Sequence, residues 1–424
     1  MMFQVFSALV FFIVVGFPVA VALGLVAVAF LSFTSVPYTI IPLQMFAGME
    51  NFVFIAMPLF MIAGELMNRS GIAEDLIELA ASLVGAVRGG LAMVNVGASM
   101  LFAEISGSAV ADVAAEGTII IPEMEKRGYP RAFAAAITSA SASIAIIIPP
   151  SLALIIYGAL AEASVAKLFI AGVVPGILLG GMLALTCYLF ALRYGWPTEG
   201  PFELRRIARA FRRAGWGLTL PVIILGGILG GIFTPTEAAA VAVFAALLIG
   251  LLVTRRFAVR DLPTIFLVAT KRTSVVLLMV ATSFAFGWFL TNQGIPELIV
   301  TRVTGLSDDP YVLMFIINML LILLGMILHG SAALVLTVPL TLPLVTAIGY
   351  DPIHFGVILA LNGAIGQQTP PVASVLLTAC SISGCRIGEV MYYNKWFILA
   401  MFITLQIVTY VPQTALFLPN LLID

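Results

Sequence analysis

Long runs without a charged residue recur along the chain and restrict what it can fold into. Residues 3–36 and 274–296 contain no Asp, Glu, Lys or Arg, and about 20 apolar residues cross a bilayer core of about 30 Å. The chain is 62% hydrophobic and only 10% charged, far from the balance of a water-soluble domain. We therefore predict an all-α integral membrane protein in a lipid bilayer. A soluble enzyme is excluded, and the net charge of −1 gives no field that would attract nucleic acid.

Charged residues, prolines and glycines divide the chain into predicted spans. Two further apolar segments, 91–124 and 311–347, are each interrupted near the middle by a Gly-Ser pair. Residues 71–88 have apolar residues at helical spacing and charges on the other face, which predicts an amphipathic helix along the cytoplasmic interface; a tilted span is the alternative. The predicted spans are 3–33, 52–67, 132–158, 168–192, 215–233, 236–253, 273–291, 353–382 and 396–418.

The basic residues orient these spans. Arginines crowd residues 193–213 and 255–272, so both regions are predicted to be cytoplasmic loops. Lys and Arg flank segment 91–124 on both sides, which predicts that this hairpin opens to the cytoplasm. No Lys or Arg occurs between Val303 and Cys385, so segment 311–347 is predicted to open outward.

The two halves of the chain also repeat short motifs at a nearly constant offset. Together with the opposite orientations, this predicts an inverted-repeat secondary transporter with two re-entrant hairpins, whose binding site lies between the repeats. The matches are Gly71-Ile72 with Gly294-Ile295, Gly107-Ser108-Ala109 with Gly330-Ser331-Ala332, Gly128-Tyr129 with Gly349-Tyr350, and Pro149-Pro150 with Pro370-Pro371.

Each half carries two breaks at membrane depth, the Gly-Ser tip and a polar stretch that ends in Pro-Pro. Interrupted backbone must be buried in protein or line a wet cavity. Its carbonyls and the nearby hydroxyls suit Na⁺, and its helix N-termini suit an anion. The alternative for any single Ser or Thr is helix packing. The predicted substrate- and ion-binding residues are Ser106, Gly107, Ser108, Asp112, Thr138, Ser139, Ser141, Pro149, Pro150, His329, Gly330, Ser331, Asn362, Gln368, Thr369 and Pro370.

Within that set the predicted Na⁺ ligands are Ser106, Ser108, Ser139, Ser331, Asn362 and Thr369. Glu104 and Glu116 share the first hairpin with Asp112, and a carboxylate inside a membrane marks function or pairing. His329 either binds a carboxylate or packs within the hairpin. No nucleotide-binding motif, zinc-ligand pattern or catalytic dyad occurs, so we expect no enzyme activity and no cofactor, with Na⁺ as the coupling ion.

Several stretches resemble the large membrane subunit of tripartite ATP-independent periplasmic (TRAP) transporters. They are residues 57–67 (MPLFMIAGELM), 106–112 (SGSAVAD), 148–151 (IPPS), 230–240 (GGIFTPTEAAA) and 369–371 (TPP). The resemblance covers essentially the whole chain, and GGIFTPTEAAA is its most specific part. His329 departs from the acidic residue that many members carry at that position.

The resemblance implies Na⁺-driven import of a small organic acid across the bacterial inner membrane by an elevator motion. It also implies two partners, a small four-span membrane subunit and a periplasmic substrate-binding protein. A stand-alone Na⁺-coupled carboxylate symporter would show the same repeat, whereas a passive channel or an intramembrane enzyme explains it less well. The predicted domains are scaffold spans with amphipathic arms in 1–90 and 193–310, and transport parts in 91–192 and 311–424.

Overall fold

The predicted all-helical class is confirmed. The computed structural model describes residues 2–305, 307–328 and 330–423, and of residues 2, 14 and 104–106 it describes the backbone alone. Every regular element in these ranges is a helix. Six helical segments are long and apolar enough to cross a membrane, or seven if α19 (Ile387–Tyr410) and α20 (Gln413–Leu422), bent by 57°, form one span. The chain is therefore a multi-pass membrane protein.

The prediction of one continuous span over 3–33 is wrong. This region forms two helices, α1 (Met2–Val14) and α2 (Val19–Leu31). Gly16 between them has a φ of +98°, a conformation that favours glycine, and Pro18 starts the second helix. The apolar composition continues through this break, so hydropathy alone does not reveal it. A short helix that was not predicted, α3 (Ile40–Met49), follows.

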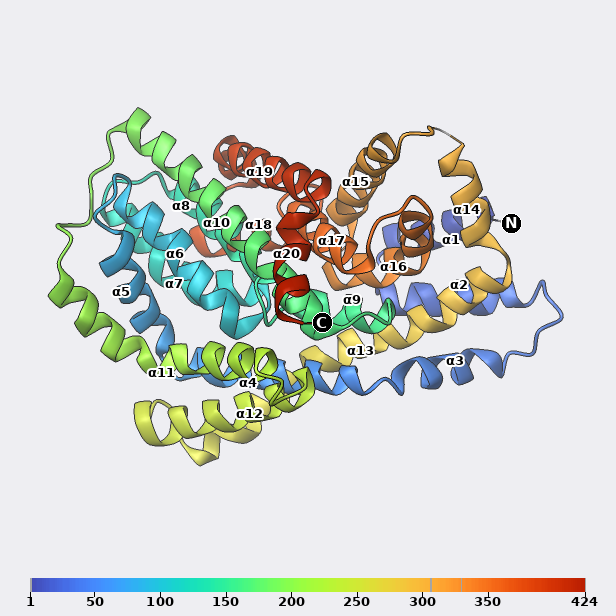
Figure 1. Ribbon diagram of the computed structural model, residues 1–424, viewed down its shortest axis with the longest axis horizontal. Helices are drawn as coiled ribbons and strands as arrows, with labels where there is room; N and C mark the ends of the chain where they lie inside the picture. The colour runs from blue at the N-terminus through green and yellow to red at the C-terminus, as the bar shows by residue number, and fades with distance from the viewer. Residues whose placement is uncertain (1, 306, 329, 424) are drawn as a thin grey trace.

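One group of helices lies along the lower side of the molecule in Figure 1. Its centre is the long helix α13, which packs against α2, α3 and α4, while α12 packs on α4 and α11 on α5. A 3₁₀ turn (Phe52–Ile55) leads into α4, and a π-helical turn (Ile249–Thr254) ends α12. The bounds are α4 (Ala56–Arg69), α5 (Ile72–Val84), α11 (Leu204–Leu229), α12 (Pro235–Leu248) and α13 (Leu262–Asn292). Helix α14 (Ile295–Thr304) follows α13 and packs on the helix Gly330–Ala347 at the upper right of Figure 1.

The second group contains the two predicted hairpins and the two interrupted helices. Its halves interdigitate, because α18 packs on α7 and α8 while α9 packs on α16. The first-half elements are α6 (Gly90–Ser106), α7 (Ala109–Lys126), α8 (Arg131–Ala142), α9 (Leu152–Leu160) and α10 (Val165–Tyr194). The second-half elements are α15 (Pro310–Ile327), α16 (Gly330–Ala347), α17 (Pro352–Gly366) and α18 (Ser374–Ser383), followed by α19 and α20.

Helix α5 is amphipathic, as predicted. Ile72, Leu76 and Leu79 are buried, and its acidic face forms ion pairs at 3.0–3.4 Å with Arg206, Arg213 and Arg256. Arg206 and Arg213 lie in the first turns of α11. The basic region expected to be a loop is thus partly helical, because the arginines pair with a neighbouring helix.

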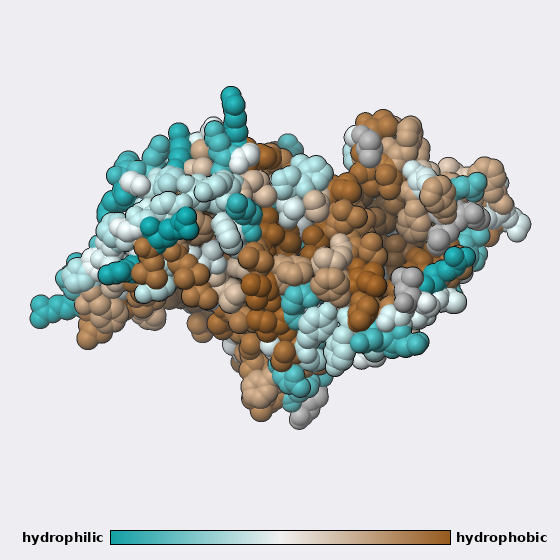
Figure 2. Space-filling model, turned by 90° about the horizontal axis from the view of Figure 1, so that it is seen from above, coloured by the Kyte–Doolittle hydropathy of each residue, from teal (hydrophilic) through white to brown (hydrophobic). Residues whose placement is uncertain are grey.

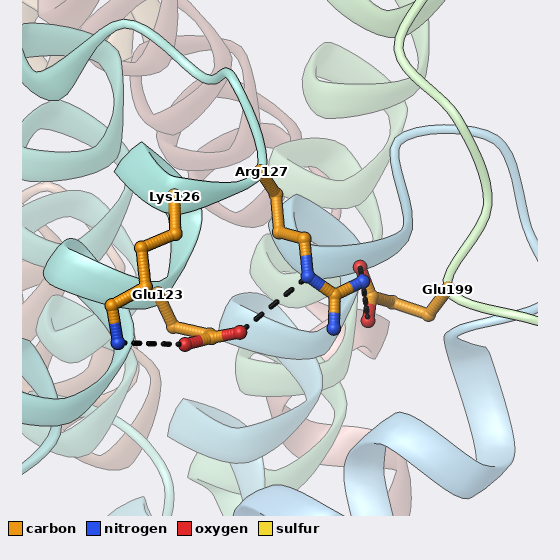
Figure 3. Close-up of polar contacts among 4 residues, drawn as sticks. All are labelled: Glu123, Lys126, Arg127 and Glu199. Atoms are coloured by element: carbon orange, nitrogen blue, oxygen red, sulfur yellow. Dashed lines mark hydrogen bonds and ion pairs between the residues drawn. The ribbon is translucent and has the colours of Figure 1, made fainter.

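A second set of ion pairs lies where α7 ends (Figure 3). Arg127 contacts Glu123 at 3.4 Å and Glu199 at 3.0 Å, and Lys126 contacts Glu123 at 3.4 Å. The backbone N–H of Glu199 also donates to the Gly85 carbonyl at 2.8 Å. The connection after α10 therefore contacts the end of α7 and the segment that leads into α6, which are the two ends of the first hairpin.

Hydrophobic residues form a broad band through the middle of the face in Figure 2, and hydrophilic residues gather mostly at its left end and along its lower edge. Large apolar side chains that are exposed include Phe46 on α3, Val222 on α11 and Phe244 on α12. Such exposure is expected where lipid takes the place of water.

Helices α15 and α17 approach each other through two glycines. A Cβ added to Gly366 would lie 2.5 Å from the Gly325 carbonyl carbon, whereas one added to Gly363 of the same helix meets no atom within 4 Å.

We predict that Gly366→Ala lowers the free energy of unfolding by about 1–3 kcal/mol, the usual cost of overpacking. Gly363→Ala is the control and should be neutral or stabilising, and thermal unfolding of the detergent-purified protein measures both. Equal melting temperatures for the two variants would contradict the close approach.

Candidate functional site

A cavity of about 460 Å³ lies between the two hairpin tips and the helices α4 and α13. This volume is in the range of small-molecule sites. Its walls come from both halves of the chain. The residues used below that line it are Met61, Glu65 and Asn68 of α4, Gly107 and Ser108 of the first tip, Arg272 and Val276 of α13, Gly330 and Ser331 of the second tip, and Gly363 and Gln367 beside the second break.

The first tip packs against the first Pro-Pro break. Gly107 has a φ of +59°, and a Cβ at this position would lie 2.6 Å from the Pro150 carbonyl oxygen. Only glycine fits both the conformation and the space. Ser108 immediately precedes α7 and lines the cavity. The N-terminus of α7 therefore faces the cavity.

The second tip lies against the second break through a side chain. A Cβ on Gly330 would lie 2.5 Å from Nε2 at the end of the Gln367 side chain, a contact that rotation of this side chain can relieve. Beyond the Pro-Pro pair, the Val372 N–H donates to the Met326 carbonyl of α15 at 3.1 Å. Each half therefore sets one tip against one interrupted helix, as expected from the repeated motifs.

The two interrupted helices also contact each other, through Gln368. Its Nε2 donates to the Ser139 carbonyl at 2.6 Å and to Ser143 Oγ at 2.7 Å. Asn394 of α19 donates to the Gln368 carbonyl at 3.1 Å. At the first break, Ser151 Oγ donates to the Ile146 carbonyl at 2.5 Å. These bonds satisfy carbonyls that the interruptions would otherwise leave exposed to hydrocarbon.

A fully buried polar network joins α6, α7 and α8. Asn95 donates to Thr138 Oγ1 at 2.7 Å, and Ser141 donates to Asn95 Oδ1 at 2.9 Å. Ser99 contacts Glu116 Oε2 at 2.7 Å and Ser141 Oγ at 2.9 Å. Thr138 and Ser141 thus serve this helix contact and are not among the cavity-lining residues. Asn95 and Ser99 were not predicted, because their partners lie 17–46 residues away in sequence.

Asn362 belongs to a second buried network. Its Nδ2 donates to Asn318 Oδ1 and to the Ile358 carbonyl, each at 2.9 Å, and Asn318 donates to Thr409 Oγ1 at 3.0 Å. These hydrogen bonds between two amide side chains and the Thr409 hydroxyl link α15, α17 and α19. Thr369 instead bonds back to the Ile365 carbonyl at 2.8 Å.

The predicted residues therefore separate into two sets. Gly107, Ser108, Gly330 and Ser331 line the cavity. Thr138, Ser139, Ser141, Asn362, Gln368 and Thr369 are not among the described lining residues. The first five hydrogen-bond across contacts between helices, and Thr369 bonds back within its own segment. Asp112 is buried in the first turn of α7, and the Pro149-Pro150 and Pro370-Pro371 bonds are both cis. His329 and the side chains of Glu104 and Ser106 lie outside the described residues.

The comparisons with known proteins agree on one family. The family model described as tripartite ATP-independent periplasmic transporter, DctM component, matches residues 6–414. The chain is 35% identical over 433 residues to the C4-dicarboxylate TRAP transporter large permease protein DctM of Rhodobacter capsulatus, covering 99% of this chain and 98% of that protein. It is 38% identical over 414 residues to the isethionate TRAP transporter permease protein DctMQ of Oleidesulfovibrio alaskensis, covering 97% of this chain and 65% of that protein.

A solved structure shares the fold at much lower sequence identity. The YdaH transporter of Alcanivorax borkumensis superimposes with a TM-score of 0.60 and 15% identity, covering 87% of each chain.

The role of Gln368 as a bridge between the interrupted helices can be tested by removing its amide. Gln368→Met keeps the length of the side chain but leaves the Ser139 carbonyl and Ser143 hydroxyl without this donor, which costs about 1–3 kcal/mol for a buried polar group. Gln406→Met is the matched control, because within the described chain the buried Nε2 of Gln406 has no hydrogen-bond partner. We predict a lower melting temperature for Gln368→Met only. Unchanged stability of that variant would show that the bridge is dispensable.

Proposed function

Because the chain belongs to the DctM family of TRAP transporter large permeases, which are transporters and not enzymes, we propose that it imports a small organic acid driven by Na⁺. The observation that carries the proposal is the cavity between the two Gly-Ser tips. It brings hydroxyls and helix termini from both halves to one place, inside a protein that hydropathy assigns to the membrane.

The tips and breaks supply the chemistry that the coupling ion requires. Na⁺ is a hard cation that takes oxygen ligands, and Ser108, Ser331 and the carbonyls near the Pro-Pro pairs provide them. We propose Ser106, Ser139, Asn362 and Thr369 as further ligands or as groups that hold the ligating backbone in place. The N-terminus of α7 at Ser108 presents a partial positive charge to the anionic substrate.

The arrangement of helices supports an elevator-type mechanism. The hairpins and interrupted helices pack mainly on one another, and the long helix α13 packs on α2, α3 and α4. We propose that the group of hairpins and interrupted helices moves as the transport part while the group around α13 stays as the scaffold. In this proposal the two halves have inverted orientations, so the same site faces the outside and the cytoplasm in turn.

The family membership also supports two partners. We propose that a periplasmic binding protein delivers the acid and that a small four-span subunit packs against this chain in the bacterial inner membrane. This chain spans 65% of the DctMQ relative. The remaining third of that relative is long enough to contain a small membrane subunit. The second candidate function is that of a stand-alone Na⁺-coupled symporter. Its only support is the predicted inverted repeat, which such a symporter would also have.

The coupling proposal is tested by uptake in proteoliposomes that contain the chain with its small subunit and binding protein. Radiolabelled isethionate and succinate are suitable first substrates, because the compared relatives are named for isethionate and for C4-dicarboxylates. We predict uptake only with all three proteins and an inward Na⁺ gradient. Undiminished uptake with K⁺ in place of Na⁺ would refute the coupling, and undiminished uptake without the binding protein would favour the stand-alone symporter.

The tip serines can be tested without knowing the substrate. A bound ion stabilises the folded protein by RT ln(1 + [Na⁺]/Kd), so the melting temperature starts to rise where the Na⁺ concentration reaches Kd. We predict that Ser108→Ala and Ser331→Ala each raise the Na⁺ concentration at which this rise starts by roughly fivefold to a hundredfold, corresponding to about 1–3 kcal/mol for a lost ligand. Ser32→Ala is the control, because its hydroxyl bonds back to the Ala29 carbonyl. Normal Na⁺ dependence in both tip variants would show that the tip serines serve only helix packing and do not bind Na⁺.

A further inference from the structure

The charged residues that line the cavity lie on one wall. Among the described lining residues, Glu65 on α4 and Arg272 on α13 are the ionisable ones, and the walls formed by the tips and by α9, α16 and α17 are neutral. Arg272 lies ten residues into α13, at the end of the basic region 255–272 that the sequence predicts to be cytoplasmic. A guanidinium at that edge of a predicted span stays charged and accessible to an anion.

Glu65 is shared between two arginines. Its Oε2 contacts Arg272 Nη1 at 3.2 Å, and its Oε1 contacts Arg69 Nε at 3.1 Å. The Glu65 side chain is only 11% exposed, whereas that of Arg272 is 54% exposed. One carboxylate between two guanidiniums leaves a net positive charge. Of the two arginines, Arg272 lines the cavity.

Arg272 has the donors to hold a second anion. A guanidinium carries five N–H groups in a planar fork, and the contact with Glu65 uses Nη1. Fork geometry allows parallel bonds to a further carboxylate or sulfonate. Asn68, one turn beyond Glu65, lines the same wall, but its Oδ1 is buried and does not face the cavity.

We propose that Arg272, positioned by Glu65, is an anion-binding residue on the α13 wall of the cavity, where it holds the carboxylate or sulfonate of a small organic-acid substrate. This rests on the proposed import of an organic acid. In the conformation that the structure shows, Arg272 then contacts the substrate from the wall opposite the tips. Glu65 keeps the guanidinium paired when no substrate is present, so an empty cavity does not leave the charge isolated.

The proposal predicts a charge preference that can be measured with any small reactive anion. Val276 lines the cavity one turn after Arg272 on α13, so Val276→Cys places a thiol beside the guanidinium. The thiol is introduced into the full chain with Cys187, Cys380 and Cys385 replaced by Ala, in permeabilised membranes. Its modification rates are compared for sulfonatoethyl methanethiosulfonate, an anion, and trimethylammonioethyl methanethiosulfonate, a cation of similar size.

We expect the anionic reagent to react faster, and Arg272→Gln to lower the anion-to-cation rate ratio by about tenfold, since a single charge nearby acts on the two reagents with opposite sign. Arg272→Lys should retain most of the preference. Arg69→Gln is the matched control, because Arg69 pairs with the same carboxylate from outside the cavity, and it should change the ratio by less than about twofold.

Three results would overturn the proposal. An unchanged ratio in Arg272→Gln would make the Glu65 pair only a structural tie between α4 and α13. Equal losses in Arg272→Gln and Arg69→Gln would place the effect on Glu65, and no reaction with either reagent would mean that the cavity admits no such anion. None of these outcomes depends on the uptake assay, so a failure here is distinguishable from a failure of the import proposal.

Discussion

A helix that is interrupted inside hydrocarbon must find partners within the protein for the backbone groups it releases, and the arrangement of this chain follows from that need. Gln368 supplies a donor to the Ser139 carbonyl, and Asn394 supplies one to the carbonyl of Gln368 itself. Ser143 and Ser151 add donors from the first interrupted helix itself, so local bonds and bonds from other helices stabilise the breaks together. The interdigitation of α9 with α16 and of α18 with α7 and α8 brings these partners together.

The same requirement explains why glycine and serine form the tips. Gly107 must come within contact distance of the Pro150 carbonyl, whereas Gly330 meets the end of the Gln367 side chain. A side chain at Gly107 would separate the first tip from its break, while one at Gly330 would displace only the Gln367 amide. The close approach also brings Ser108 and Ser331 to one cavity, so the packing that stabilises the breaks also assembles the neutral wall of the site.

The sequence predicted the elements whose signals are local. Helical hairpins, the Pro-Pro breaks and the amphipathic α5 each follow from residues close together in the chain. Partners distant in sequence were not predictable. Asn95 meets Ser141 46 residues away, and Glu65 meets Arg272 207 residues away. The break at Gly16 was missed because glycine and proline are common in membrane helices.

The division of the cavity walls has a physical consequence for specificity. Neutral hydroxyls and backbone on the tips suit a cation that must lose its water, while the one cationic side chain among the described lining residues lies on α13 across the cavity. If anion and cation are held by different walls, substitutions along α13 and α4 can change which acid binds without altering the ion ligands. Relatives named for isethionate and for C4-dicarboxylates would then differ mainly on this wall. The tips, constrained by their contact with the breaks, have much less freedom to vary.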